Sequence, residues 1–193
     1  MGNKFTVITF LILCFISTTA CAATFKGKVI DADTKQPIEG AVVVASWREA
    51  RAGIAGEDTR LKDVKETLTD KNGEWVIKGP KGREGGNITA IFTFLTGTYY
   101  TRPPQLIVFK PGYCSYPEGF MIDACKEKMK TYNFTNSDNV GETVELPKLI
   151  RREDRLMVLP GPVAGENALM KQKEFIRLIN EESKYLGIPE AYH

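Results

Sequence analysis

Five residues with binding chemistry lie close together in this chain. Tyr99, Tyr100 and Arg102 precede an apolar segment, and Tyr113 and Tyr116 follow it. Aromatic rings that carry a polar group suit the faces of sugars. We therefore predict that these residues form a ligand- or partner-binding cluster around one connection between strands. The alternative is that they pack into the core and its loops.

The residues needed for catalysis are scarce. The one histidine, His193, stands at the end of the sequence, which argues against a histidine dyad, a histidine-rich metal site and a Ser-His-Asp triad. Adjacent carboxylates occur at Glu57–Asp58 and Glu153–Asp154, but nothing nearby is expected to raise the pKa of one member, as acid–base catalysis requires. We expect them to be solvated, and we predict no catalytic residues and no cofactor.

The first 22 residues have the pattern of a secretory signal peptide. Lys4 gives a basic start, residues 5–16 are apolar, and small residues lead to Ala22. The apolar run is shorter than the roughly 20 residues that span a bilayer, but it fits the core of a signal peptide. We predict cleavage between Ala22 and Ala23 and export to the periplasm or the cell exterior.

Two alternatives remain for this leader. Residues 18–21, Thr-Thr-Ala-Cys, resemble a bacterial lipobox, which would lipidate Cys21 and make the protein an outer-membrane lipoprotein. Thr18, however, stands where such motifs usually have leucine. The second alternative is an uncleaved anchor. Beyond the leader, no segment is long and apolar enough to cross a membrane.

Export determines how the remaining cysteines are interpreted. Cys14 and Cys21 belong to the leader, which leaves Cys114 and Cys125. An even pair in an oxidising compartment predicts a disulfide. Zinc is not expected, because two cysteines without nearby histidines cannot complete a tetrahedral shell. Calcium is not expected at Asp31 and Asp33, because Lys35 stands where an oxygen ligand belongs.

The composition is that of an ordinary globular protein, with 42% hydrophobic and 26% charged residues. Twenty-six Lys and Arg against 24 Asp and Glu give a net charge of +2. A nucleic-acid-binding protein needs a basic face to displace counterions from phosphates. This charge balance therefore argues against nucleic acid as a partner.

The elements that would position these residues are mostly short β-strands. Apolar alternation or continuous apolar runs predict strands at residues 24–31, 41–47, 64–69, 74–78, 88–95, 106–109 and 142–146. The valine-rich run at 41–47 predicts a strand buried on both faces. Asn72-Gly73 predicts a hairpin between the third and fourth strands, with Trp75 and Ile77 on one face of the fourth. Residues 51–63 are interpreted as a surface loop.

The polar segments after the tyrosines predict helix. A short helix is expected around residues 121–130, and a longer amphipathic helix over 166–186. Gly187 and Pro189 give that helix a suitable end. Its apolar face is expected to pack on the protein's own sheets or, alternatively, to dock on a partner.

Four ordered motifs resemble the carboxypeptidase regulatory-like domain. They are Gly27–Asp31 (GKVID), Pro37–Val43 (PIEGAVV), Thr69–Trp75 (TDKNGEW) and Lys110–Tyr113 (KPGY). The resemblance covers about residues 24–113 and implies a transthyretin-like, seven-stranded antiparallel Greek-key sandwich. Its glycines and prolines serve turns, so it implies a scaffold rather than a reaction. The segment 114–141 and the C-terminal helix lie outside it.

The sequence therefore predicts a mainly β protein with a C-terminal helix, divided into a signal peptide (1–22), a sandwich (23–150) and a helical extension (151–193). We expect a non-catalytic, exported module of the cell envelope that acts through protein–protein interaction. The alternative is a module that binds glycan or a surface polymer through its tyrosine-rich loop.

Overall fold

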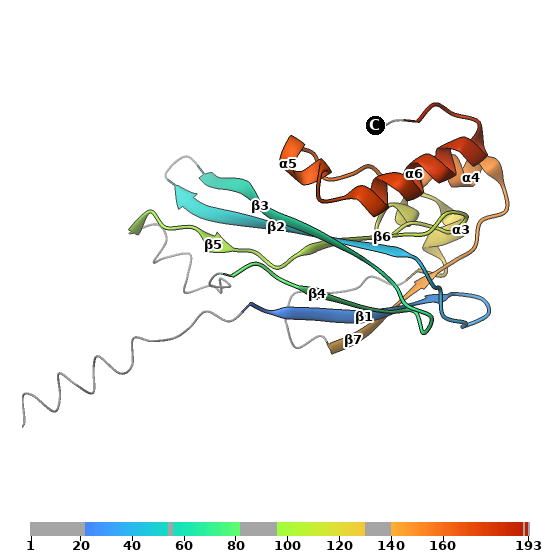
Figure 1. The fold of residues 1–193 in the computed structure, drawn as a ribbon, viewed down its shortest axis with the longest axis horizontal. Helices are drawn as coiled ribbons and strands as arrows, with labels where there is room; N and C mark the ends of the chain where they lie inside the picture. Colours follow the sequence, from blue (N-terminus) through green and yellow to red (C-terminus); the bar gives the residue numbers. More distant parts are fainter. Residues whose placement is uncertain (1–21, 54–55, 82–95, 130–139, 191, 193) are drawn as a thin grey trace, which may run out of the picture.

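The computed structural model describes residues 22–53, 56–81, 96–129, 140–190 and 192 (Figure 1). The elements in chain order are β1 (Thr24–Asp31), β2 (Val42–Gly53), β3 (Gly56–Leu68), β4 (Glu74–Lys78), β5 (Tyr100–Thr101), β6 (Gln105–Phe109), η1 (Glu118–Met121), α3 (Asp123–Lys126), β7 (Val140–Leu146), α4 (Arg152–Met157), α5 (Glu166–Leu169) and α6 (Lys173–Leu186). The strand expected at residues 88–95 lies outside the described residues.

The seven described strands form two sheets. One sheet has the order β4-β1-β7; in the other, β2 pairs with β3 on one side and with β5 and β6 on the other. The prediction of a mainly β fold with a C-terminal helix is confirmed. The prediction of fully antiparallel strands is wrong, because β1 and β7 run parallel, with Val29 opposite Val144. The chain between β1 and β7, which includes all strands of the other sheet, supplies the long crossover that parallel neighbours need.

The main core lies between the two sheets. In β1 the residues Phe25, Gly27, Val29 and Asp31 are buried and alternate with more exposed ones. In β2 six successive residues from Val42 are buried. Val43, Ala45 and Trp47 belong to the core between the sheets, whereas Val42 and Val44 belong to a second core on the outer face. The predicted burial of this strand on both faces is confirmed.

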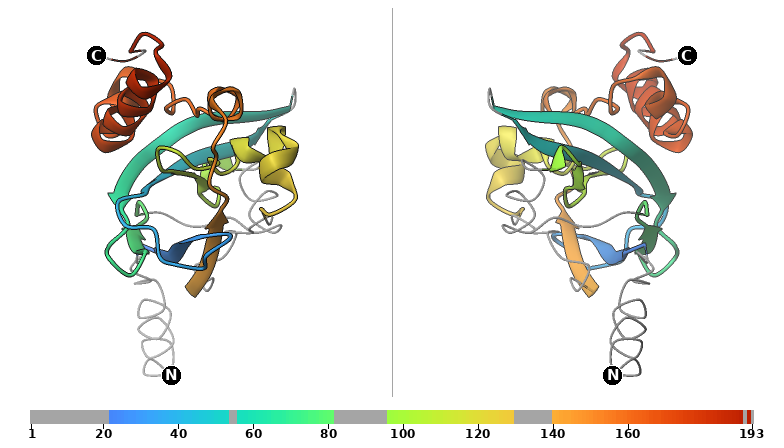
Figure 2. Two further views of the ribbon diagram at one scale, coloured as in Figure 1. Left: turned by 90° about the vertical axis from the view of Figure 1, so that its right-hand side faces the viewer. Right: turned by 90° about the vertical axis from the view of Figure 1, so that its left-hand side faces the viewer.

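The second core lies beneath the C-terminal helices. Figure 2 shows α4, α5 and α6 outside the sheet that contains β2 and β3, with the other sheet on the far side. Phe175 and Ile179 of α6 pack with Val42 and Val44, and the rings of Phe175 and Phe109 meet edge to face at 6.1 Å. The helix therefore packs on the protein's own sheet, as the first alternative expected.

The helix expected over residues 166–186 is divided into α5 and α6. Gln172, which lies between them, is fully buried, and its side chain bonds to backbone groups of Val163 and Ala168 at 3.0 Å. The carboxylate of Glu66 on β3 accepts the N–H groups of Glu174 and Phe175 at 2.9 and 3.0 Å and so caps α6. As predicted, α6 ends at Gly187 in the left-handed conformation.

The expected loop at residues 51–63 is instead a pair of long strands. β2 continues to Gly53, and β3 begins at Gly56. Glu49 binds Arg60 at 2.5 Å and Arg51 binds Asp58 at 3.2 Å across these strands. Such cross-strand pairs stabilise a sheet without apolar residues. We call the paired segments Arg48–Gly53 and Gly56–Lys62 the arm.

The hairpin predicted at Asn72-Gly73 is wrong. β3 pairs with β2, whereas β4 pairs with β1, so this turn carries the chain from one sheet to the other. The carboxylate of Asp70 accepts the N–H groups of Asn72 and Glu74 at 2.9 and 2.8 Å. Beyond the turn, Trp75 and Ile77 are buried and alternate with exposed residues, as predicted.

Cys114 and Cys125 lie at disulfide-bond distance, with their sulfur atoms 1.97 Å apart. Both are fully buried and belong to the core between the sheets. The short helix expected around residues 121–130 corresponds to η1 and α3. The cysteine pair therefore holds this helical segment against the chain that follows β6.

Candidate binding surface

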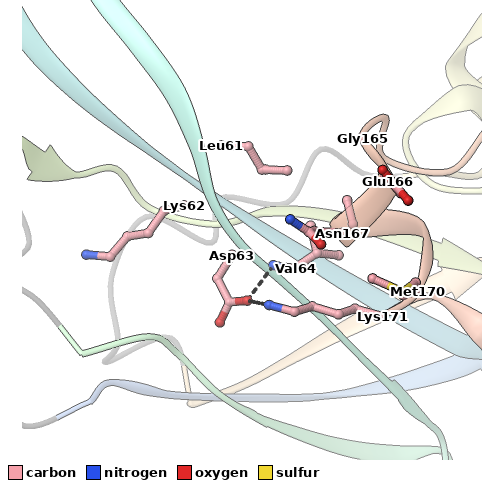
Figure 3. Close-up of a pocket in the computed structure, with 10 residues that line it drawn as sticks. Leu61, Lys62, Asp63, Val64, Gly165, Glu166, Asn167, Met170 and Lys171 are labelled. Carbon is pink, nitrogen blue, oxygen red and sulfur yellow. Dashed lines mark hydrogen bonds and ion pairs between the residues drawn. The ribbon is translucent and has the colours of Figure 1, made fainter.

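A cleft of about 520 Å³ opens between β3 and the segment around α5 (Figure 3). Leu61 and Val64 line it from the sheet, and both contribute to the outer core. Asn167, Ala168 and Met170 line it from the helical side, where Met170 is 60% exposed. The cleft therefore joins an apolar floor to a rim that is open to solvent.

An ion pair borders this cleft. Asp63 accepts hydrogen bonds from the Lys171 ammonium at 2.5 Å and from the backbone N–H of Val64 at 2.9 Å. Lys62 extends away from α5 (Figure 3) and donates to the Thr101 hydroxyl at 2.5 Å. The register of β2 and β3 shifts at this point, between Trp47 and Arg48. Such a bulge redirects neighbouring side chains. It accounts for Asp63 extending toward Lys171 while Lys62 extends away from α5.

The outer face of the sheet continues from the cleft onto the arm. Arg48 lies opposite Leu61, and Ala50 lies opposite Tyr100. The N–H of Arg102 donates to the carbonyl of Arg48 at 2.8 Å. Because opposed residues share a face and side chains alternate along a strand, Arg48, Tyr100 and Arg102 lie on the same face as Leu61. We call this surface the open face.

The polar groups of the open face are ordered before any partner binds. Glu57 accepts a hydrogen bond from the Tyr100 hydroxyl at 2.7 Å and pairs with Arg102. These contacts, first the hydroxyl and then the guanidinium, lower the pKa of Glu57. The bond to Glu57 raises the pKa of Tyr100. Arg48 is exposed, and its side chain has no hydrogen bond or ion pair within the part of the chain that the structure describes.

Tyr99 makes a separate set of contacts. Its hydroxyl binds Asp58, and this hydrogen bond raises the pKa of Tyr99. The guanidinium groups of Arg51 and Arg60 lie over its ring, 4.9 and 4.1 Å from the centroid. Tyr99 is therefore already engaged in cation–π contacts within the arm.

The five residues predicted as one cluster form two groups. In the first group, Tyr100 and Arg102 lie on the open face of the arm, whereas Tyr99 contacts Asp58, Arg51 and Arg60 on its other face. Tyr113 and Tyr116 follow β6, whose last residue, Phe109, pairs with the opposite end of β2. Tyr113 is half-buried, and its burial and the nearby Asp31 raise the pKa of its hydroxyl, whereas Tyr116 belongs to the core between the sheets. The binding role of the first group stays a prediction.

Several residues of this surface were not singled out by the sequence. Arg48, Leu61 and Met170 reach it through strand register and helix placement, which no local motif announces. Glu57 and Asp58 were expected to be solvated in a loop. They lie on β3 and accept hydrogen bonds from the hydroxyls of Tyr99 and Tyr100. The alternation of their charges with those of Arg51 and Arg60 was a sequence feature that could have indicated paired strands.

The described residues contain neither a metal-binding cluster nor a membrane-spanning helix. Among the described residues, no group of three or more His, Cys, Asp or Glu side chains is arranged to hold a metal ion. Within those residues, no helix has the length and apolar character that a membrane span requires.

Comparisons with known proteins give weak likenesses. No family model and no curated protein matches the chain. A Streptococcal ancillary pilin matches 68% of this chain and 31% of its own at 10% identity, with a TM-score of 0.32. A mutant catechol 1,2-dioxygenase of Acinetobacter radioresistens matches 79% of this chain and 58% of its own at 20% identity, with a TM-score of 0.33. The chain thus spans less than two thirds of either protein, and these values assign neither a family nor a function.

Proposed function

We propose that this chain is a non-catalytic, exported binding module of the cell envelope that acts through protein–protein interaction. The observation that carries the proposal is the open face with its adjoining cleft. Arginine and tyrosine are the residue types that dominate the energetics of protein interfaces. Here they are held in place by Glu57 and by β-sheet register, so binding would cost less side-chain entropy.

The electrostatics of the arm favour binding over catalysis. A general acid needs a carboxyl group with a raised pKa, and a general base or nucleophile needs a group that ionises readily. At the arm, the pKa of Glu57 is lowered and the pKa values of Tyr99 and Tyr100 are raised. Each group is therefore held in its ordinary protonation state, which suits recognition.

A protein partner is favoured over a glycan by the state of the tyrosines. A sugar would stack on a free ring face and bond to a free hydroxyl. Arg51 and Arg60 lie over the Tyr99 ring, and both tyrosine hydroxyls are bonded to carboxylates. Glycan binding would require these contacts to be exchanged.

Export is supported by the leader pattern and by the cysteine pair at bonding distance. Disulfides persist in oxidising compartments outside the cytosol. Residues 1–21 of the leader lie outside the described residues. Intact-mass measurement of the protein from its source cells tests this part: cleavage before Ala23 gives the soluble form, and a lipid on Cys21 gives the lipoprotein form.

The interaction is tested by chemical cross-linking in intact source cells, with the wild type and a Tyr99→Ala/Tyr100→Ala variant compared. We expect one protein to recur among the cross-linked products of the wild type. If no protein recurs, and the chain fractionates with surface polysaccharide in a manner that the double variant abolishes, the glycan alternative replaces the proposal. Turnover in a hydrolase screen would contradict both.

A further inference from the structure

We propose that the open face and its cleft bind an acidic segment of the partner protein. One apolar side chain of that segment enters the cleft, and neighbouring carboxylates pair with Arg48 and Arg102. This inference rests on the proposed function and names the chemistry of the partner.

The cleft has the composition of an anchor site. Leu61, Val64 and Ala168 form its apolar part, Met170 stands exposed at the rim, and the charged side chains of Lys62, Asp63, Glu166 and Lys171 line the remainder. Its volume of about 520 Å³ is within the range of about 300–1,000 Å³ that ligand pockets occupy. The side chain of Asn167 projects from α5 toward β3 (Figure 3), where its amide can donate to and accept from a peptide group. Such a site favours an apolar side chain carried on a polypeptide.

The charge beside the cleft selects an acidic segment. Arg48 and Arg102 lie side by side on neighbouring strands, and Glu57, the carboxylate beside them among the described residues of the arm's outer face, is already bound by Arg102. A guanidinium group has five N–H donors in a planar fork that matches a carboxylate. Arg48 keeps all of its side-chain donors available within the described structure. A basic segment would instead be repelled.

The placement of opposite charge gives the segment a direction. On the α5 side, Glu166 lines the cleft and the neighbouring Lys171 is paired with Asp63, whereas Arg48 adjoins the cleft on the arm side. Carboxylates of the partner are therefore expected over the arm, and the side facing Glu166 is expected to be neutral or basic.

The test is site-specific photo-cross-linking in the source cells. A benzophenone amino acid replaces Met170 at the cleft rim or, as the control, Val76, which is 55% exposed on the other sheet. The cross-linked peptides are sequenced by mass spectrometry. We expect the Met170 position to capture a peptide with at least two acidic residues close to an apolar one, and the Val76 position to capture none.

Charge reversal gives the second readout. Arg48→Glu is expected to lower capture from Met170 at least tenfold, whereas Arg48→Lys keeps part of it. Lys26→Glu, at an exposed position opposite Val76, makes the same change of charge and is expected to leave capture unchanged. Circular dichroism verifies that each variant is folded.

The outcomes separate this inference from the proposed function. Three outcomes overturn the inference but leave the proposed protein partner in place. They are capture from Val76 alone, capture of a basic or neutral peptide from Met170, and capture that Arg48→Glu does not change. Recovery of polysaccharide with no protein from either position overturns both.

Discussion

At the scale of single residues, Asp31 connects β1 to the turn that follows it. Its carboxylate accepts the N–H groups of Asp33 and Thr34 at 2.9 and 2.8 Å. Burial disfavours the charged form, but these bonds, with the hydroxyls of Thr34 and Tyr113, outweigh it and lower the pKa of Asp31 from its usual 3.8. The Asp31 carboxylate thus stabilises the turn that follows β1.

This lowered pKa predicts an acid-dependent contribution to stability. As pH falls below 3.8, the unfolded chain binds the proton first, so the contribution of Asp31 is complete above that value and is lost through the folded pKa. Asp31→Asn should cost about 2 kcal/mol at pH 6 and progressively less under acid conditions. Urea unfolding between pH 6 and 2.5 measures this. For the exposed control Glu127→Gln, the difference in unfolding free energy from the wild type should not shrink as the pH falls. A difference for Asp31→Asn that stays constant with pH would contradict the prediction.

Gly73 predicts a second effect at a single position. Its φ is +73°, and an added Cβ would lie 2.3 Å from the carbonyl oxygen of Val29. Gly97 has a similar φ of +66° but nothing within 4 Å of its Cβ position. We expect Gly97→Ala to cost about 1 kcal/mol for backbone strain and Gly73→Ala a further 1–3 kcal/mol, roughly, for overpacking. Chemical denaturation of both variants measures the difference, and equal costs would show that the contact is relieved without strain.

At the scale of elements, a buried ion pair fastens α4 to α6. Arg155 donates to both carboxylate oxygens of Glu182 at 2.6 Å, and their side chains are 11% and 3% exposed. The same guanidinium lies 3.9 Å from the centroid of the Tyr185 ring. Removing one partner of such a pair leaves a buried charge uncompensated.

The neighbouring glutamate provides a matched control. Glu182→Ala is expected to lower the free energy of unfolding by about 3–5 kcal/mol. Glu181, next in the sequence, pairs with Arg177 on the exposed side at 3.3 Å, and Glu181→Ala should cost less than about 1 kcal/mol. Urea unfolding at neutral pH distinguishes them. Similar losses for the two variants would mean that the Arg155–Glu182 pair acts as a surface pair.

The alternation of apolar and polar residues in the sequence correctly predicted the strands in which buried and exposed residues alternate. β1 and β4 have the bounds that alternation indicates, because each presents one face to the core. The arm was missed because it extends beyond the core, where Arg51 and Asp58 stabilise it by charge instead of by apolar alternation. The division of the C-terminal helix was missed because it depends on Gln172, whose backbone partners are set by tertiary structure.

The candidate site shows the same limit. Tyr99, Tyr100 and Arg102 were recognised by residue type, and the structure places all three at the arm, with Tyr99 on the opposite face from the other two. Tyr113 could not be separated from them by sequence, because β6 carries the chain along the length of β2 before Tyr113 is reached. Arg48 enters the open face through its register with Leu61. Register between strands is a long-range property that residue types leave undetermined.

At the scale of the whole molecule, the layers depend on one another. The valine-rich part of β2, residues 42–47, is buried on both faces, by the second sheet on one side and by α6 on the other. The sequence pattern predicts a boundary at residue 150, with the helical region after it as an extension of the sandwich. The outer core, however, is built from both sides of that boundary, with Val42, Val44 and Phe109 before it and Phe175 and Ile179 after it.

This shared core predicts that the sandwich does not tolerate loss of its helices. Deleting residues 151–193 would uncover the apolar face formed by Val42, Val44 and Phe109, and exposed apolar patches of that kind promote association. We expect the truncated chain to aggregate or to unfold at lower urea, as size-exclusion chromatography and urea unfolding would report. A full-length Phe175→Asp/Ile179→Asp variant retains the chain but prevents docking, so it should behave in the same way. A truncated chain that remains monomeric and as stable as the full-length protein would contradict this prediction and show that the sandwich is an independent domain. The face formed by Val42, Val44 and Phe109 would then be available to a partner.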